Sequence, residues 1–129
     1  MSSELVPADV RVVWDQIKPG LHYVLGKTNA PWRPEDVYHT LISGAAYLYV
    51  GDSGFVILQP KADPFTGQSD LLVWIAYSPK GDAAVCYQAA LDDIAREAGF
   101  KKLVLWSNRP GWERVSGWTQ TAAVYERAV

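Results

Sequence analysis

The stretch that decides the fold is residues 71–84, LLVWIAYSPKGDAA, in which an unbroken apolar run ends in a turn of small and polar residues. Strands that are apolar at every position usually lie in the middle of a sheet, with both faces covered. Pro79 and Gly81 follow the run directly, and Asp82 is a residue type that commonly caps a helix. We therefore predict a buried central strand over 71–77, then a tight turn, then a helix.

On the carboxyl-terminal side, the pattern predicts that this helix ends at Gly99 and that a second apolar strand spans 102–106. The helix has an apolar stripe at helical spacing, made of Ala83, Tyr87, Ala90, Leu91, Ile94 and Ala98. A strand–helix–strand unit of about 35 residues is long enough for a right-handed crossover between parallel strands. After it we predict a short helix over 109–115 and a last strand over 118–127.

On the amino-terminal side, the spacing of apolar residues predicts helices followed by a hairpin. Pro19-Gly20 is expected to break or kink the first helix, and residues 21–25 either continue it for a turn or two or run extended. The predicted elements are a short strand at 5–6, a helix at 10–17 capped by Asp9, a helix at 34–42 ended by Gly44, and hairpin strands at 46–50 and 55–58.

The complete order is β-α-α-β-β-β-α-β-α-β, with an antiparallel front and one parallel crossover near the back. This order predicts the α/β class with a mixed sheet. It differs from a doubly wound nucleotide-binding domain, in which crossovers repeat throughout. The length of 129 residues suits a single domain over 1–129, and 49% hydrophobic with 20% charged residues is typical of a globular protein.

Charge and composition argue against several kinds of function. The net charge is −2 and the basic residues are scattered, so nucleic acid is not an expected partner. We see no signal peptide and no apolar run of membrane-spanning length, so we expect a cytoplasmic protein without a membrane partner. His22 and His39 are far apart, so no metal site is predicted. The single Cys86 is expected to be a small buried residue rather than a nucleophile.

The order of elements resembles the GNAT fold of acyl-CoA N-acyltransferases, over most of the chain. Members carry a pyrophosphate-binding loop of the form Gln/Arg-x-x-Gly-x-Gly/Ala between the fourth strand and the long helix. The matching stretch here is 78–83, in which Gly81 and Ala83 fit and Ser78 replaces the Gln or Arg. A helix start with small residues can accept a phosphate. A carboxylate of Asp82 at the N-cap would compete for the same N–H groups.

The resemblance implies that this segment holds acetyl-CoA. Loop residues Ser78, Lys80, Gly81, Asp82 and Ala83 would hold the pyrophosphate, the backbone of Trp74, Ile75, Ala76 and Tyr77 would pair with the pantetheine arm, and Asn108 would contact the cofactor. A plain strand–turn–helix connection with an Asp cap is the alternative interpretation of the same residues.

The catalytic groups of the family are missing from their usual places. Members often have a Tyr about four residues before a Gly-Phe-like pair, and Glu113 stands there, ahead of Gly117-Trp118. No carboxylate lies within 71–77 to act as a general base, and neither Asp70 nor Asp92 is placed near an acceptor by the pattern. We therefore assign no catalytic residue.

Aromatic residues supply further candidates. Tyr47, Tyr49 and Trp106 either line an acyl or acceptor pocket or belong to the core. The group Trp112, Arg114 and Trp118 has the composition of a partner-binding surface.

Two hypotheses about function follow. The first is an acetyl-CoA-dependent N-acetyltransferase acting on a small amine or a protein. The second is a catalytically inactive GNAT-like binding or structural protein, similar to small GNAT-like proteins encoded among the virion genes of tailed bacteriophages. Its partner would be a second copy or a virion component, and its location would be the virion.

Overall fold

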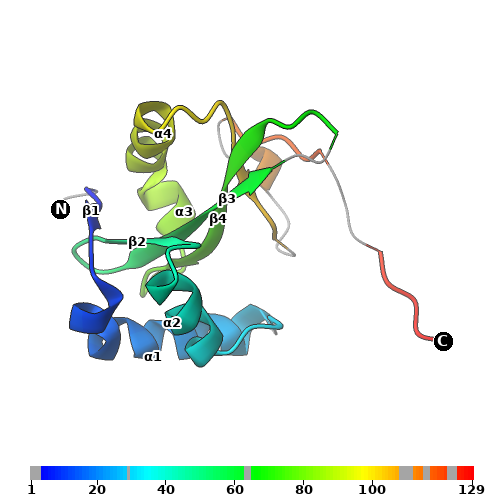
Figure 1. The fold of residues 1–129 in the computed structure, drawn as a ribbon. Coiled ribbons are helices and arrows are strands. Elements are labelled where there is room, and N and C mark those ends of the chain that lie inside the picture. Colours follow the sequence, from blue (N-terminus) through cyan, green and yellow to red (C-terminus); the bar gives the residue numbers. More distant parts are fainter. Residues whose placement is uncertain (1–3, 29, 63–64, 108–111, 115–116, 122–124) are drawn as a thin grey trace.

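The computed structural model of the chain describes residues 4–28, 30–62, 65–107, 112–114, 117–121 and 125–129. Within these residues the sheet has five strands in the order β1-β2-β3-β4-β5, with helices on both faces (Figure 1). The strands are β1 (Val6–Pro7), β2 (Tyr47–Val50), β3 (Phe55–Ala62), β4 (Ser69–Tyr77) and β5 (Leu103–Leu105). The helices are α1 (Val10–Thr28), α2 (Pro34–Ile42), α3 (Ala83–Cys86), α4 (Gln88–Glu97) and the 3₁₀ helix η1 (Trp112–Arg114).

The sheet is mixed. The strands β1 to β4 pair antiparallel in sequence order, whereas β4 and β5 are parallel and are joined through α3 and α4. The predicted α/β class, with an antiparallel front and one parallel crossover, is therefore confirmed.

β3 shows why the middle of the sheet is apolar throughout. Phe55 and Ile57 pack into the core beneath α1 and α2, which we call the α1/α2 core. Val56 and Leu58 point to the opposite side, into the core beneath α3 and α4, which we call the α3/α4 core. Because alternate side chains of a strand enter opposite faces, the half of β3 that is covered on both sides, residues 55–58, has no position left for a polar residue.

α1 differs from the prediction because Pro19 does not break it. The helix runs for 19 residues with Pro19 inside. Pro19 and Asp15, whose carbonyl loses its helical partner, are both exposed, so water can hydrate that carbonyl. The expected Asp9 cap is present, since its side-chain oxygen accepts the backbone N–H of Arg11 at 2.9 Å.

The helix after the turn also differs from the prediction. One helix was expected from the turn to Gly99, but α3 ends at Cys86 and α4 begins at Gln88, with Tyr87 between them outside helical geometry. Tyr87 is almost fully buried and its ring lies against Gly51, where an added Cβ would come within 2.8 Å of the ring. Packing of this large side chain onto the β2–β3 turn accounts for the interruption.

The predicted last strand over 118–127 is not seen in the described residues. Residues 117–121 and 125–129 belong to no strand, and residues 122–124 lie outside the described residues. The chain end runs away from the sheet (Figure 1), and Tyr125 is 90% exposed. Alternating side chains favour a strand only where a neighbour supplies hydrogen bonds. Within the ranges given above, no helix is both long and apolar enough to cross a bilayer.

Candidate ligand-binding site

Among the described residues, no strand pairs with the outer edge of β4 over its last four residues, and we call this stretch the open edge. Pairing with β5 covers Leu71, Leu72 and Val73, whose partners are Leu103, Val104 and Leu105, and stops there. β4 continues through 74–77, where the only strand beside it among the described residues is β3. A strand edge without a neighbour presents N–H and C=O groups for pairing with another chain or ligand.

A β-bulge lies where the pairing of β4 with β5 ends. Ile75 pairs with Ile57 and Val73 pairs with Leu58, so Trp74 has no residue opposite it. Alternation is interrupted at the same place, since Val73 packs into the α3/α4 core while Trp74 and Ile75 both pack against the α1/α2 core. A bulge bends its strand and increases the local twist. The bend accounts for the separation of β4 from β5 beyond this point.

The turn after β4 is closed by Ser78. Its carbonyl accepts the N–H of Gly81 at 3.0 Å. Its hydroxyl, on a side chain that is only 6% exposed, donates to Oδ1 of Asp82 at 2.8 Å and accepts the backbone N–H of Asp82 at 3.0 Å. Gly81 has φ +75, a left-handed conformation that favours glycine, and the space around it is open.

This arrangement changes the expected role of Asp82. The residue occupies the N-cap position of α3, but its side chain makes no capping hydrogen bond. The prediction of an Asp82 side-chain cap is therefore wrong, because the carboxylate is held by Ser78 instead. Among the described residues, neither Ala83 nor Ala84 donates its backbone N–H to an acceptor. The two N–H groups at the start of α3 stay available to an anion.

The other predicted cofactor-binding positions fall into three groups. The first group is contiguous in sequence: residues 74–77 end β4, Ser78, Gly81 and Asp82 belong to the turn, and Ala83 begins α3. Lys80 is exposed in the turn. Asn108 lies outside the described residues, as does the side chain of Glu113.

The aromatic candidates do not line the open edge as a group. Tyr47 and Tyr49 share one face of β2, as expected, but Tyr47 is 51% exposed and Tyr49 packs against the α3/α4 core. Trp106 follows β5 and is 75% exposed, so it is not a core residue. Trp112 and Trp118 meet edge to face with ring centroids 5.8 Å apart. The indole N–H of Trp118 donates to Oε1 of Gln88 on α4 at 3.0 Å.

The polar candidate residues do not gather at the open edge either. Asp70 lies at the start of β4, opposite Lys61, at the end of the strand away from the turn. Asp92 is on α4, and Cys86, which was expected to be buried, is exposed on α3. In the parts of the chain that the structure describes, no group of His, Cys, Asp and Glu side chains has the arrangement of a metal site.

The sequence patterns did not predict a cluster of aromatic rings around the last residue of β4. The ring of Tyr77, the last residue of β4, stacks on Phe55 with centroids 5.4 Å apart and meets Tyr23 of α1 edge to face at 5.7 Å. The ammonium group of Lys27 lies over the Tyr23 ring, 5.7 Å from its centroid. The available signal was the helical spacing of Tyr23 and Lys27, which places both side chains on one face of a helix.

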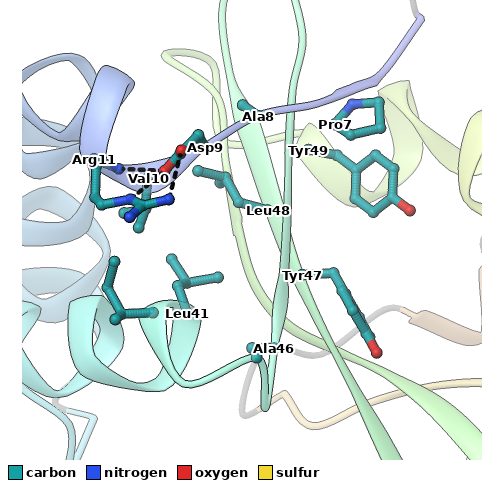
Figure 2. A pocket seen from close by; sticks show the side chains of 12 residues that line it. Pro7, Ala8, Asp9, Val10, Arg11, Leu41, Ala46, Tyr47, Leu48 and Tyr49 are labelled. Atoms are coloured by element: carbon teal, nitrogen blue, oxygen red, sulfur yellow. Dashed lines mark hydrogen bonds and ion pairs between the residues drawn. The ribbon is translucent and has the colours of Figure 1, made fainter.

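A separate pocket lies at the other edge of the sheet. It encloses about 330 Å³ between the β1–α1 turn, the end of α2 and β2, with Leu41, Ala46 and Leu48 in its lining (Figure 2). Arg11 and Asp9 lie on its rim and bind each other, with Nη2 to Oδ2 at 3.1 Å. Hydrogen bonds from Arg11 hold the pKa of the Asp9 carboxyl below its usual value. The charged pair is therefore already satisfied within the protein.

Comparisons with known proteins address the fold. No family model matches the sequence, and no curated protein matches it. Solved structures similar across nearly the whole chain include a ribosomal-protein-alanine N-acetyltransferase from Brucella melitensis, at 20% identity and a TM-score of 0.68, with 98% of this chain and 99% of that chain covered. They also include a GCN5-related N-acetyltransferase from Ralstonia eutropha (13% identity, TM-score 0.69) and a GNAT family acetyltransferase from Staphylococcus aureus (10% identity, TM-score 0.65), each with 97% of both chains covered. At these identities the similarity is one of fold, and the chain has the fold of the GCN5-related N-acetyltransferases.

Proposed function

We propose that this chain is an acetyl-CoA-dependent N-acetyltransferase that binds the thioester along the open edge of β4. The observation that carries the proposal is the end of β4–β5 pairing at Val73 and Leu105, beyond which four further residues of β4 have no strand on that side in the described part of the chain. The pantetheine arm of CoA contains amide groups in an extended chain, and such a chain can pair with an open strand edge. The backbone of Trp74, Ile75, Ala76 and Tyr77 is the surface proposed for it.

The turn after β4 fits the pyrophosphate in this proposal. Gly81 leaves open space, and Ala83 and Ala84 are small residues whose backbone N–H groups have no acceptor in the described chain. Backbone N–H groups without an acceptor at a helix start favour an anion at this place. Ser78 keeps the Asp82 carboxylate away from these N–H groups, and Lys80 adds a positive charge. We propose Asn108 as a further contact.

Catalysis would depend on positioning. Acetyl-CoA supplies an activated acyl group, whose carbonyl carbon is attacked by the acceptor amine as the carbon–nitrogen bond forms and the carbon–sulfur bond breaks. The amine gives up a proton to solvent, and the thiolate of CoA leaves and takes a proton from solvent. No carboxylate lies within 71–77 to serve as a base. The chain would therefore act by holding an amine beside the thioester, which by itself accelerates such reactions substantially.

The absence of a carboxylate in this stretch also favours a second candidate, a GNAT-like protein that binds a partner without catalysis. A second copy or a component of a bacteriophage virion is the proposed partner in that case, and the virion its location. For the enzyme we propose a single domain that acts in the cytoplasm on a small amine or a protein.

The test is ligand-induced stabilisation followed by turnover. Saturation at about 100 times Kd stabilises a protein by about 2.7 kcal/mol, which corresponds to a rise in Tm of about 10 °C for a domain of this size. We expect this rise with acetyl-CoA and with CoA. Release of free thiol in the presence of amines would then separate the enzyme from the non-catalytic protein. No change in Tm at millimolar acetyl-CoA would exclude the enzyme.

Gly81→Glu locates the site. A bulky anion on the turn should abolish the stabilisation by acetyl-CoA. Gly67→Glu is the matched control, because Gly67 also has a positive φ, +72 against +75, and also faces open space, but it lies in the β3–β4 loop. If Gly67→Glu removed the ligand effect and Gly81→Glu did not, the site would lie elsewhere.

A further inference from the structure

A row of aromatic rings connects the core of the protein with the open edge of β4. The row begins at Gly20 of α1, where an added Cβ would lie 2.7 Å from Cε1 of Phe55 and 2.9 Å from Cδ2 of Tyr77. The missing side chain lets both rings lie close to the helix. Tyr77 stacks on Phe55 and touches Tyr23 edge to face. Tyr23, although 46% exposed, is therefore held in place by its contact with the last residue of β4.

Lys27 completes the row at the surface. It lies one helical turn beyond Tyr23, and its ammonium group is 5.7 Å from the centre of the Tyr23 ring. A cation over an aromatic ring is attracted to it, which restricts a side chain that otherwise has many rotamers. No ion pair joins Lys27 to a carboxylate among the described residues. Lys27 thus carries a positive charge that has no acidic partner among the described residues and lies over the ring that contacts Tyr77, the last residue of β4.

The turn itself has little positive charge to offer a phosphate. Ser78 stands where the resembled family has Gln or Arg, and the nearby Asp82 carboxylate repels anions. Lys80 is the one cationic residue in the turn sequence 78–83. A ligand with several phosphate groups would be held more tightly if a second cation approached from another element.

We propose that Lys27, held by Tyr23, is a specificity-determining residue that binds a phosphate group of the ligand on the open edge. It selects thioester carriers that contain phosphates over the unphosphorylated pantetheine arm. This inference rests on the proposed function. Removing one charged hydrogen bond of this kind is expected to weaken binding about tenfold.

The experiment compares dissociation constants for CoA, dephospho-CoA and pantetheine, measured by calorimetry on the full chain. Lys27→Met should weaken CoA binding about tenfold and leave pantetheine binding unchanged. Lys27→Arg should retain the preference, and Tyr23→Leu should reduce it by releasing Lys27. Dephospho-CoA, which lacks the 3′-phosphate, shows which phosphate Lys27 binds. If Lys27 binds the 3′-phosphate, Lys27→Met should not change the affinity for dephospho-CoA; if it binds the pyrophosphate, the affinity should fall as it does for CoA.

Lys18→Met on the exposed side of the same helix is the control, and it should change none of these constants. Lys27 also lies in the last turn of α1, where a cation stabilises a helix. That role would lower Tm in Lys27→Met without changing the ratio of CoA to pantetheine affinity. An unchanged ratio in Lys27→Met would overturn the inference while leaving the proposed function standing. If the wild-type chain bound neither CoA nor pantetheine, both would fail together.

Discussion

The two halves of β4 are built from the same kind of residue but have different surroundings. Residues 71–73 lie between two strands, with β3 on one side and β5 on the other. Residues 74–77 continue the same apolar run, yet only β3 accompanies them within the described chain. The backbone of the closed half pairs with strands on both sides, whereas one edge of the open half can pair with a ligand. We therefore expect substitutions at the closed half to change stability and those at the open half to change binding.

The largest effect on stability is expected in the closed half. Leu71 is 2% exposed and packs in the α3/α4 core, so Leu71→Ala should lower the free energy of unfolding by about 3 kcal/mol through lost burial and a remaining cavity. Urea denaturation measures this difference. The folded fraction of the variant should bind acetyl-CoA with unchanged affinity. A loss below about 1 kcal/mol would mean that the closed half does not anchor the sheet.

An intermediate effect is expected beneath the open half. Gly20→Ala places a methyl group against Phe55 and Tyr77 at distances below 3.0 Å, and the overpacking should destabilise the protein by about 1–2 kcal/mol. Gly26→Ala, in the same helix and facing open space, should instead stabilise it by up to about 1 kcal/mol, because alanine favours helix. Thermal unfolding should show opposite signs. Equal effects of the two substitutions would show that α1 does not press on Tyr77.

The smallest effect is expected at the turn. Ser78→Ala removes both hydrogen bonds to Asp82 and should lower the free energy of unfolding by about 1 kcal/mol. It also frees the Asp82 carboxylate to cap α3, so acetyl-CoA binding should weaken. Ser43→Ala, which removes an exposed bond to the carbonyl of Thr40, is the control and should change stability less and binding not at all. Binding that survives Ser78→Ala unchanged would contradict the proposed role of the pair.

Much of the sheet could be predicted because its elements are determined locally. The hairpin strands, the apolar strand of 71–77 and the crossover to the strand after Gly99 are each recognisable in a short window of sequence. The errors have a common cause. Pro19 is tolerated because α1 is held by tertiary packing, and the helix after the turn is interrupted because Tyr87 packs against Gly51. The chain after β5 alternates like a strand but has no strand beside it in the described residues.

The candidate site was only partly visible in the sequence. The turn over 78–83 was found because glycine, proline and aspartate are strong local signals. The contact between Tyr23 and Tyr77 was not found, because it joins residues that are far apart in the chain and carries no periodic pattern of its own. Asp82 was assigned to the wrong partner, since a carboxylate near a helix start has several donors within reach and only the geometry chooses among them.

By itself, the sequence determined that a buried strand over 71–77 is followed by a tight turn and a helix, since these follow from side-chain hydrophobicity and backbone preference. Only the tertiary structure decided that this strand has a closed half and an open half. The bulge at Trp74 depends on its register with β3, and the open edge depends on where β5 leaves. Both are relations between segments distant in sequence, and pairing between such segments is fixed by the packing of the whole sheet.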